Sequence, residues 1–170
     1  MSVAQEHTSI YLHRYGYEDG MSHRNVFGVA QTPDGLIWLA TINALNRYDS
    51  YRFRHYAPSD LTGLPAPPYQ AIAATPQGAL WLGCGAQLTR VQPQGHRARS
   101  WPIPADEGEE WQIHEILPQG AHTCHVLARA LPSGRLYWWR WHQGAWQEVG
   151  WQPAAESTAM SRWRGTILWL

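Results

Sequence analysis

The sequence predicts an all-β fold, a partial β-propeller of four-stranded antiparallel blades that does not close within the chain. Three observations support this prediction. A block of about 43 residues recurs along the chain, each clear copy contains short strand-like runs joined by tight turns, and both ends of the chain correspond to incomplete copies. Propellers have about four to eight blades of four strands each. Helical repeats of similar length need long stretches with a 3.6-residue period, which this sequence lacks.

The repeat is clearest in the segments 26–39 and 69–82, in which equivalent residues are 43 positions apart. Both segments contain a Thr-Pro-x-Gly sequence followed by an apolar run with a tryptophan, Trp38 in the first and Trp81 in the second. The same register continues through two further pairs, Leu45 with Leu88 and Arg47 with Arg90. The match therefore covers a whole supersecondary unit.

Within the first copy the local signals are those of strands. The run 26–32 ends at Pro-Asp-Gly, in which the proline presets φ and the glycine accepts a positive φ, as a hairpin turn requires. Further strand-like runs follow at 36–41, 45–48 and 51–56. The composition, with eleven Trp and eight Tyr, also suits pleated strands. We therefore predict four strands in each complete copy.

The copies divide residues 1–170 into the parts of one incomplete propeller. We expect the outer strand of a preceding or closing blade over 8–20, blade 1 over 21–62, blade 2 over 63–105, blade 3 over 106–152 and the start of blade 4 over 153–170. Open ends would expose strand edges and apolar blade faces. We therefore expect either the remaining blades of a longer protein or other protomers to complete the ring.

Composition excludes several classes of partner. Thirteen basic and thirteen acidic side chains give a net charge of zero, so there is no electropositive field for nucleic acid. No run approaches the ~18 to 20 apolar residues of a membrane helix, and residues 1–8 lack the pattern of a secretory signal. We expect no membrane contact in this segment. Cys84 and Cys124 are too few for a disulfide framework and are expected to be free thiols.

Two segments, 25–41 and 45–49, resemble the two-component regulator propeller repeat, and the match includes the run Pro33-Asp34-Gly35-Leu36-Ile37-Trp38-Leu39. Residues 75–90 resemble it a second time. The resemblance implies a periplasmic sensing domain of a bacterial hybrid histidine kinase or a related membrane signalling protein. Such proteins often respond to oligosaccharides or other small molecules. Their propellers precede a β-sandwich, a membrane helix and cytoplasmic output domains.

Propeller geometry predicts ligand contacts in the loops that enter the innermost strands and in those that join the second and third strands. These loops are 22–25, 42–44, 67–69 and 83–85. The side chains expected to contact a ligand are Arg24, Asn25, Asn43 and Tyr69. Their alternative role is to cap strand ends and satisfy backbone groups.

Tryptophans offer a second kind of candidate site. Trp38 and Trp81 could stack on sugar rings, but their repetition at one strand position favours packing between blades. The aromatic cluster 137–141, with Trp146 after the next turn, is not repeated. Alternation along a strand places its members on both faces. This cluster is expected to pack between blades, with contact to a ligand or partner as the alternative.

No metal, cofactor or catalytic site is predicted. His122 and Cys124 would share one face of a strand while His125 points to the other, and a structural zinc site normally needs four ligands. The sequence also lacks a Gly-x-Ser-x-Gly elbow and a glycine-rich phosphate loop.

Three functions remain open. The leading hypothesis is a non-catalytic, ligand-sensing input module of a two-component or related receptor. The alternative is a free-standing carbohydrate- or protein-binding module that closes by oligomerisation. An enzyme of the virginiamycin lyase type, which is also a propeller, is the third, although fold does not confer function.

Overall fold

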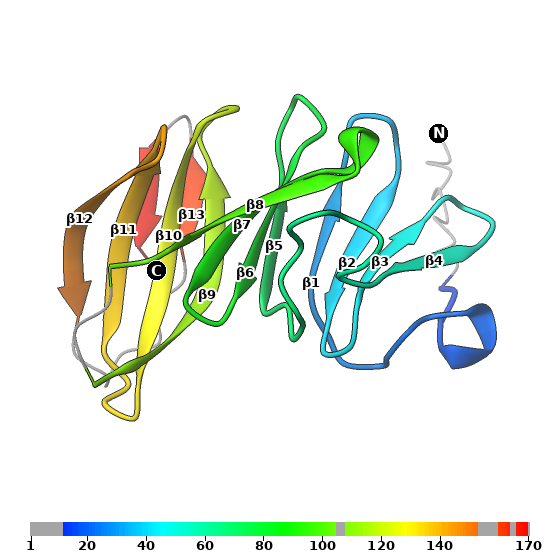
Figure 1. The fold of residues 1–170 in the computed structure, drawn as a ribbon, viewed down its shortest axis with the longest axis horizontal. Coiled ribbons are helices and arrows are strands. Elements are labelled where there is room, and N and C mark those ends of the chain that lie inside the picture. The colour runs from blue at the N-terminus through cyan, green and yellow to red at the C-terminus, as the bar shows by residue number, and fades with distance from the viewer. Residues whose placement is uncertain (1–11, 105–107, 153–159, 164–165, 170) are drawn as a thin grey trace, which may run out of the picture.

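The computed structural model describes residues 12–104, 108–152, 160–163 and 166–169, and this part of the chain is all-β (Figure 1). It contains three four-stranded antiparallel sheets and one two-stranded hairpin, with no α-helix among the described residues. The predictions of an all-β fold and of four-stranded antiparallel sheets are confirmed.

In each sheet the strands pair in chain order. Sheet 1 consists of β1 (Val26–Gln31), β2 (Ile37–Thr41), β3 (Leu45–Tyr48) and β4 (Phe53–Tyr56). Sheet 2 consists of β5 (Ala71–Ala74), β6 (Leu80–Cys84), β7 (Gln87–Gln92) and β8 (Arg97–Pro102). Sheet 3 consists of β9 (Glu110–Pro118), β10 (Thr123–Leu131), β11 (Leu136–His142) and β12 (Ala145–Gln152). The remaining elements are the hairpin β13 (Met160–Trp163) and β14 (Thr166–Trp169) and the 3-10 turns η1 (Tyr17–Asp19) and η2 (Pro93–Gly95).

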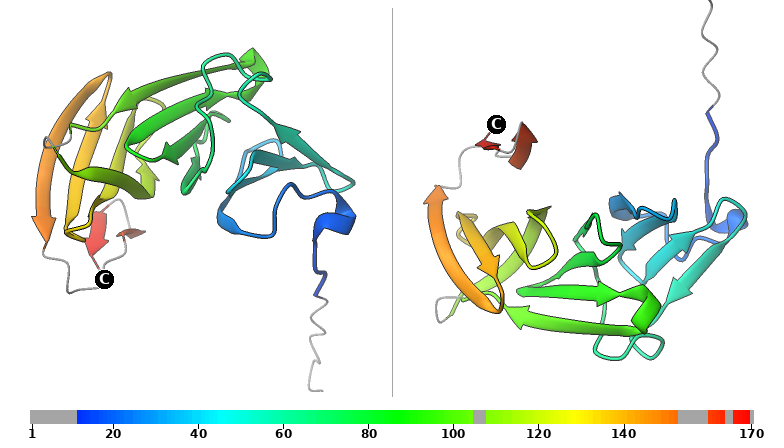
Figure 2. Two further views of the ribbon diagram at one scale, coloured as in Figure 1. Left: turned by 60° about the horizontal axis from the view of Figure 1, so that its bottom comes forward. Right: turned by 90° about the horizontal axis from the view of Figure 1, so that it is seen from above.

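The three sheets follow one another along an open arc (Figure 2). The first strands of the sheets are neighbours, since β5 lies against both β1 and β9. The hairpin β13–β14, in the range expected to begin a further blade, approaches sheet 3 through β9. The sheets therefore meet face to face, with their first strands on the inner side of the arc.

The Thr-Pro-x-Gly sequences form the turns that the sequence predicts. Gly35 and Gly78 have φ angles of +83° and +80°, a region that favours glycine. The amide of Thr32 donates to the Leu36 carbonyl at 3.0 Å, and the amide of Thr75 donates to the Ala79 carbonyl at 2.8 Å. Each turn thus closes a hairpin between the first and second strands of its sheet.

The first core lies between sheets 1 and 2. Trp38 of β2 is 1% exposed, and its indole N–H donates to the Thr32 hydroxyl at 3.2 Å. Its ring lies 5.5 Å from that of Tyr56 on β4. Leu80 and Leu82 of β6 belong to the same buried cluster. Trp38 therefore packs between the sheets, as predicted, and offers no ring face to solvent.

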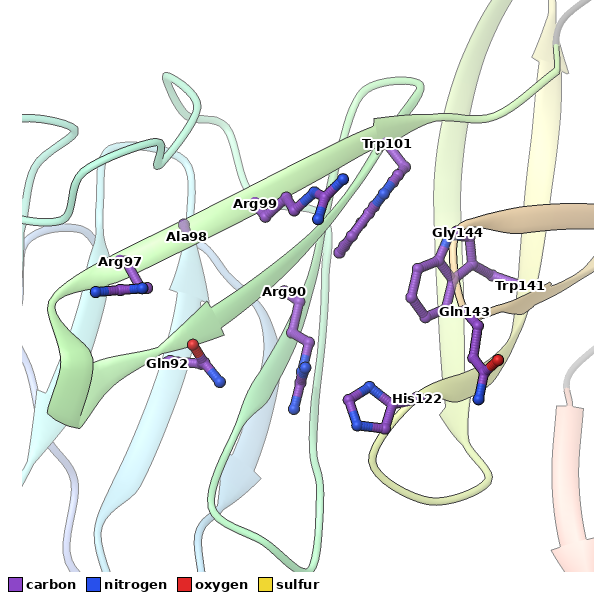
Figure 3. Close-up of a pocket in the computed structure, with 10 residues that line it drawn as sticks. All are labelled: Arg90, Gln92, Arg97, Ala98, Arg99, Trp101, His122, Trp141, Gln143 and Gly144. Carbon is purple, nitrogen blue, oxygen red and sulfur yellow. The ribbon is translucent and has the colours of Figure 1, made fainter.

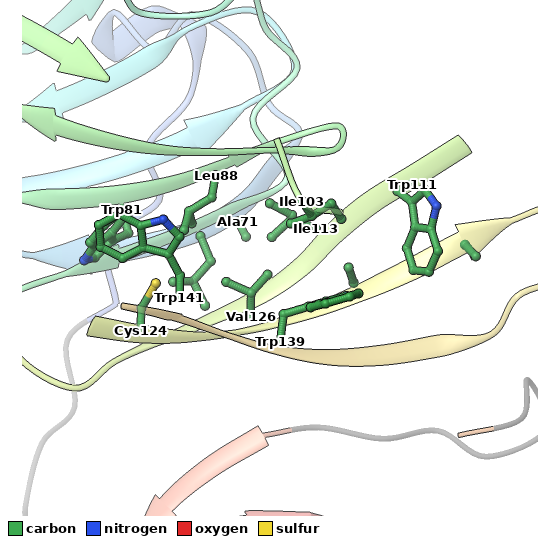
Figure 4. Close-up of a cluster of buried hydrophobic side chains, with 13 residues drawn as sticks. Ala71, Trp81, Leu88, Ile103, Trp111, Ile113, Cys124, Val126, Trp139 and Trp141 are labelled. Carbon is green, nitrogen blue, oxygen red and sulfur yellow. The ribbon is translucent and has the colours of Figure 1, made fainter. Parts of the chain in front are cut away.

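The second core lies between sheets 2 and 3 and contains several indoles (Figure 4). Trp81 of β6 is fully buried, and its ring centroid lies 4.9 Å from that of Trp141 on β11. Trp139 belongs to the same cluster, and Tyr137 packs against it. The predicted alternation is confirmed, because Trp138 packs on the other face of sheet 3, beside Leu127.

Sheet 3 differs from the first two sheets. Its strands β9 and β10 have nine residues each, against four to six in the equivalent strands. Register shifts interrupt the pairing between Leu127 and Ala128 and between Trp138 and Trp139. The buried Cys124 of β10 is one of the two free cysteines, and the indoles that meet sheet 2 come from β11. The third copy therefore shares the architecture of the repeat with a different side-chain pattern.

The outer strand expected over 8–20 is not seen in the described part of that range. Residues 12–16 form no strand, and Tyr17–Asp19 form a 3-10 turn between Gly16 and Gly20. The Asp19 carboxylate accepts the Gly16 amide at 2.8 Å, which stabilises the turn. Tyr15 instead packs against sheet 1, and its hydroxyl lies 2.9 Å from that of Tyr48. Residues 1–11 lie outside the described part of the chain.

Gly83 of β6 provides a test of the packing between sheets 2 and 3. A Cβ at this position would lie 2.6 Å from Cγ2 of the buried Ile113. We expect Gly83→Ala to lower the free energy of unfolding by about 1–3 kcal/mol, because overpacking forces the neighbours to move. Gly150→Ala is the matched control, since a Cβ there meets nothing within 4 Å. Equal urea midpoints for the two variants would contradict this packing.

His125 of β10 makes stability depend on pH. Its Nδ1 accepts the Trp138 indole N–H at 2.9 Å, and burial together with the charge of Arg140 lowers its pKa. The unfolded chain therefore binds this proton at a higher pH than the folded chain. Because of this difference, the free energy of unfolding should fall as pH decreases through the ordinary histidine value of about 6.5.

His125→Gln keeps a hydrogen-bond acceptor and removes the titration, so its stability should fall less between pH 7.5 and 5.5. Urea denaturation at several pH values measures the difference between the two proteins. Parallel stability profiles would show that His125 does not contribute to the pH dependence.

Candidate functional site

The four predicted ligand loops lie at one end of the sheets, called here the loop end. The amide of Tyr69 donates to the Thr41 carbonyl at 3.1 Å, which joins the loop before β5 to the end of β2. The amide of Gln70 donates to the Gly83 carbonyl at 2.9 Å. On the other side of sheet 2, the amide of Ile113 donates to the Gly85 carbonyl at 2.9 Å. Backbone hydrogen bonds thus hold the loops of neighbouring sheets together.

A buried polar network anchors the first of these loops. Asn46 of β3 is fully buried and accepts the Ser22 amide at 2.9 Å through Oδ1. Its Nδ2 donates to the Ser22 hydroxyl at 2.7 Å, and that hydroxyl lies 3.1 Å from the Thr41 hydroxyl. The Thr41 hydroxyl also donates to the Ala44 carbonyl at 2.7 Å. The network fixes where the loop 22–25 leaves the sheet.

Three of the four predicted ligand contacts are exposed on this frame. Arg24, Asn25 and Asn43 are exposed, and their side chains make no hydrogen bond or ion pair with the part of the chain that the structure describes. Two of the backbone amides are used locally, since that of Asn25 donates to His23 Nδ1 at 2.9 Å and that of Asn43 donates to the Thr41 hydroxyl at 3.4 Å. These three side chains are free to meet a ligand at the loop end.

Tyr69, the fourth predicted contact, lies in the core. Its side chain is fully buried among the residues between sheets 1 and 2. Its hydroxyl donates to the Pro65 carbonyl at 2.7 Å, and burial raises its pKa well above the usual value. The alternative role considered for this residue, satisfying backbone groups at a strand end, describes its contacts.

The cysteines and histidines do not assemble a reactive centre in the described residues. The Cys84 thiol donates to the Ala66 carbonyl at 2.8 Å, and burial raises its pKa, which keeps it protonated. Cys124 is buried toward sheet 2, whereas His125 contacts Trp138 on the other face of sheet 3. Within the described ranges, no three His, Cys, Asp or Glu side chains gather as metal ligands do.

A groove that the sequence did not predict lies toward the opposite end, between sheets 2 and 3 (Figure 3). Its volume is about 530 Å³. One wall comes from β7 and β8, and the other from the turns that flank β10 and β11. The lining residues are Arg90, Gln92, Arg97, Ala98, Arg99, Trp101, His122, Trp141, Gln143 and Gly144. We refer to it as the arginine groove.

The arginine groove combines positive charge with indole rings. The Arg99 guanidinium lies 5.2 Å from the ring centroid of Trp101, and Trp101 lies 4.5 Å from Trp141. Arg90 and Arg99 stand directly opposite each other on β7 and β8. No acidic residue lines the groove. One wall of the groove could have been recognised in the sequence from the alternation of basic or aromatic residues with small ones in the run His96-Arg97-Ala98-Arg99-Ser100-Trp101.

Comparison with known proteins identifies the fold. No family model matches the chain, and no curated protein matches its sequence. The extracellular domain of the hybrid two component system BT4673 from B. thetaiotaomicron matches with a TM-score of 0.60 and 18% identity, over 74% of this chain and 17% of that chain. The extracellular domain of BT3049, from the same organism and also a hybrid two component system, matches with a TM-score of 0.55 and 15% identity, over 81% of this chain and 26% of that chain.

The chain therefore shares the fold of a part of these extracellular domains, and it spans about a quarter of their length or less. The resemblance to receptor input domains found in the sequence is confirmed at the level of the fold. Among the residues that the structure describes, no helix has the length and apolar character needed to cross a membrane.

Asn46 tests whether the buried network positions the loop end. Asn46→Ala removes partners from the Ser22 amide and hydroxyl, and we expect a loss of about 1–3 kcal/mol in the free energy of unfolding. Faster hydrogen exchange at the Ser22 amide should accompany it. The exposed Asn43→Ala is the control and should stay within about 0.5 kcal/mol of the parent. An unchanged Ser22 exchange rate in Asn46→Ala would contradict the anchoring role.

Proposed function

We propose that the chain is a ligand-sensing, non-catalytic input module of a bacterial two-component or related signal-transduction receptor, located in the periplasm. In this proposal the three sheets are successive blades of a β-propeller whose other blades complete the ring. The observation that carries the proposal is the match of the fold to extracellular domains of hybrid two component systems.

The outward face of sheet 1 supports an incomplete ring. Phe27 and Val29 of β1 are 50% and 60% exposed on this face. Ile72, the residue of sheet 2 equivalent to Val29 at the 43-residue spacing, packs against the core shared with sheet 1. An apolar sheet face of this kind is normally covered by another layer. A preceding blade would cover sheet 1 as sheet 1 covers sheet 2.

The loop end supports a sensing role. Exposed polar side chains there, Arg24, Asn25 and Asn43, project from loops that hydrogen bonds fix to the sheets. Binding residues are commonly carried by loops on a rigid scaffold. An oligosaccharide or another small polar molecule fits hydrogen-bonding groups of this type. The Cys84 thiol, which burial keeps protonated, is a poor nucleophile, and this favours binding over catalysis at the loop end.

The same exposed face of sheet 1 leaves a second candidate function. A free-standing carbohydrate- or protein-binding module could cover Phe27 and Val29 with another copy of the chain and close the ring by oligomerisation. The two candidate functions differ in what completes the ring, further blades of the same protein or other copies of the chain. The gene and the oligomeric state distinguish them without knowledge of the ligand.

The gene that encodes the chain tests the proposal. We expect its reading frame to encode further four-stranded repeats, a β-sandwich, a membrane helix and an output domain. Light scattering of the 170-residue chain should then show monomers or undefined aggregates. A stop codon directly after Leu170 in an intact locus, together with a closed oligomer of one defined mass, would reject the receptor and support the free-standing module.

A further inference from the structure

Sheet 1 provides an internal reference for the arginine groove. In sheet 1, Trp38 stands opposite Arg47, and Arg47 stands opposite Arg54. In sheet 2, the corresponding register pairs are Trp81 with Arg90 and Arg90 with Arg99. Each sheet also has an arginine over an aromatic ring on its last strand. Arg54 lies 4.9 Å from the Tyr56 centroid in sheet 1, and Arg99 lies 5.2 Å from the Trp101 centroid in sheet 2. The two sheets therefore carry the same arrangement of cations and rings.

The two arrangements differ in their acidic partner. In sheet 1 the Asp49 carboxylate lies 4.0 Å from Arg47 and 3.8 Å from Arg52. The residue 43 positions later, where a carboxylate would serve Arg90, is Gln92. Arg97 of sheet 2 corresponds to Arg52 of sheet 1, because each lies two residues before the last arginine of its sheet. Arg97 has no carboxylate partner in the described residues, whereas Arg52 has Asp49. Sheet 2 thus keeps the arginines and lacks the anion that balances them in sheet 1.

The missing carboxylate leaves Arg90 with an unpaired charged group. Its Nε is buried and has no hydrogen-bond partner in the part of the chain that is described. Arg47 has an unpartnered Nε as well, but its Nη2 reaches Asp49. A buried donor of a charged group that lacks a partner costs about 1–3 kcal/mol or more. A bound anion would supply the missing acceptor.

Sheet 3 gives the groove its second wall. Trp141 lies against Trp101, and His122 and Gln143 face Arg90 across the opening (Figure 3). The groove continues into a second hollow of about 350 Å³, which shares Arg90, Gln92 and Arg97 with it. Small-molecule sites usually have volumes of about 300–1,000 Å³. The first hollow alone is large enough for a ligand with one ring.

The chemistry of the walls defines the ligand class. Guanidinium groups bind carboxylate and sulfate oxygens through paired N–H donors. Indole rings pack against the C–H groups or faces of a ring. His122 and Gln143 add polar contacts at the opposite wall. The acidic residues Glu109 and Glu110 at the start of β9 lie at the loop end of sheet 3, so they do not fill the groove.

We propose that the arginine groove binds a small organic anion in which a carboxylate or sulfate is attached to a ring. Arg90, Arg97 and Arg99 bind the anionic group, and Trp101 with the edge of Trp141 contacts the ring. The ring can belong to an acidic sugar or to an aromatic acid, because both present the same combination of charge and apolar surface. This site is separate from the loop end and does not depend on the receptor assignment.

The experiment titrates the chain with D-glucuronate and benzoate, each beside its neutral counterpart, D-glucose and benzamide, and with inorganic sulfate. NMR shifts of the Trp101 indole N–H report occupancy. We expect the two ring-bearing anions to shift this signal, with neutral counterparts and sulfate at least ten-fold weaker. A preference for glucuronate or for benzoate identifies the source of the ring. No shift with either anion, or equal binding of the neutral compounds or of sulfate, overturns the proposal.

Gln92→Asp is the decisive variant, because it gives sheet 2 the carboxylate that sheet 1 has at Asp49. Gln92 is exposed, so the variant should fold, and we expect at least a ten-fold loss of affinity for the ring-bearing anions. Gln87→Asp adds the same charge at the exposed start of β7, at the loop end, and should bind within about two-fold of the parent. Equal affinities of the two variants would show that no specific anion site exists in the groove.

Discussion

The structure depends on one constraint, which is that each four-stranded sheet is apolar on both faces. Sheet 2 presents Leu80 and Leu82 to sheet 1 and Trp81 to sheet 3, and all three side chains are fully buried. Four short strands cannot bury two apolar faces alone, so they are stable only between neighbours. The hydrogen bonds that join adjacent loops, such as Tyr69 to Thr41 and Ile113 to Gly85, exist because the faces have first been brought together. Packing between sheets therefore positions Tyr69 and the two walls of the arginine groove, whereas the Asn46 network within sheet 1 positions the loop 22–25.

The strands of sheet 1 could be predicted to within one or two residues because local chemistry determines them. The Thr-Pro-x-Gly turns set the hairpins, and Trp38 and Trp81 recur at the strand position that faces the next sheet. Sheet 3 was predicted from spacing alone. Its buried indoles come from β9 and β11 instead of β10, and the register shift between Leu127 and Ala128 interrupts the alternation of buried residues on β9. The 3-10 turn at Tyr17–Asp19 was not predicted, and Tyr15, the last residue of the strand-like run 10–15, packs its ring against Tyr48 of sheet 1.

The candidate sites were predictable to different degrees. Loop position, which follows from the order of the strands, led to Arg24, Asn25 and Asn43, and all three are exposed at the loop end. The burial of Tyr69 follows from contact between two sheets, which one copy of the repeat does not reveal. The arginine groove joins residues 90–101 to residues 122–144 across such a contact. Its walls become neighbours only when sheet 3 stacks on sheet 2, so the local run 96–101 indicates one wall and not the groove itself.

A repeat nevertheless contains information about function in the positions where its copies differ. Side chains that recur in equivalent places, such as Trp38 and Trp81, meet the common requirement of covering a sheet face. Positions 49 and 92 are equivalent and both lie beside arginines. Neither side chain is needed to cover a sheet face, since Asp49 forms surface ion pairs and Gln92 is exposed. Isolated surface ion pairs contribute little to stability, so the fold tolerates the loss of the carboxylate from sheet 2. The loss leaves three arginines beside two indoles without an internal anion, and stability alone gives no reason to keep them together.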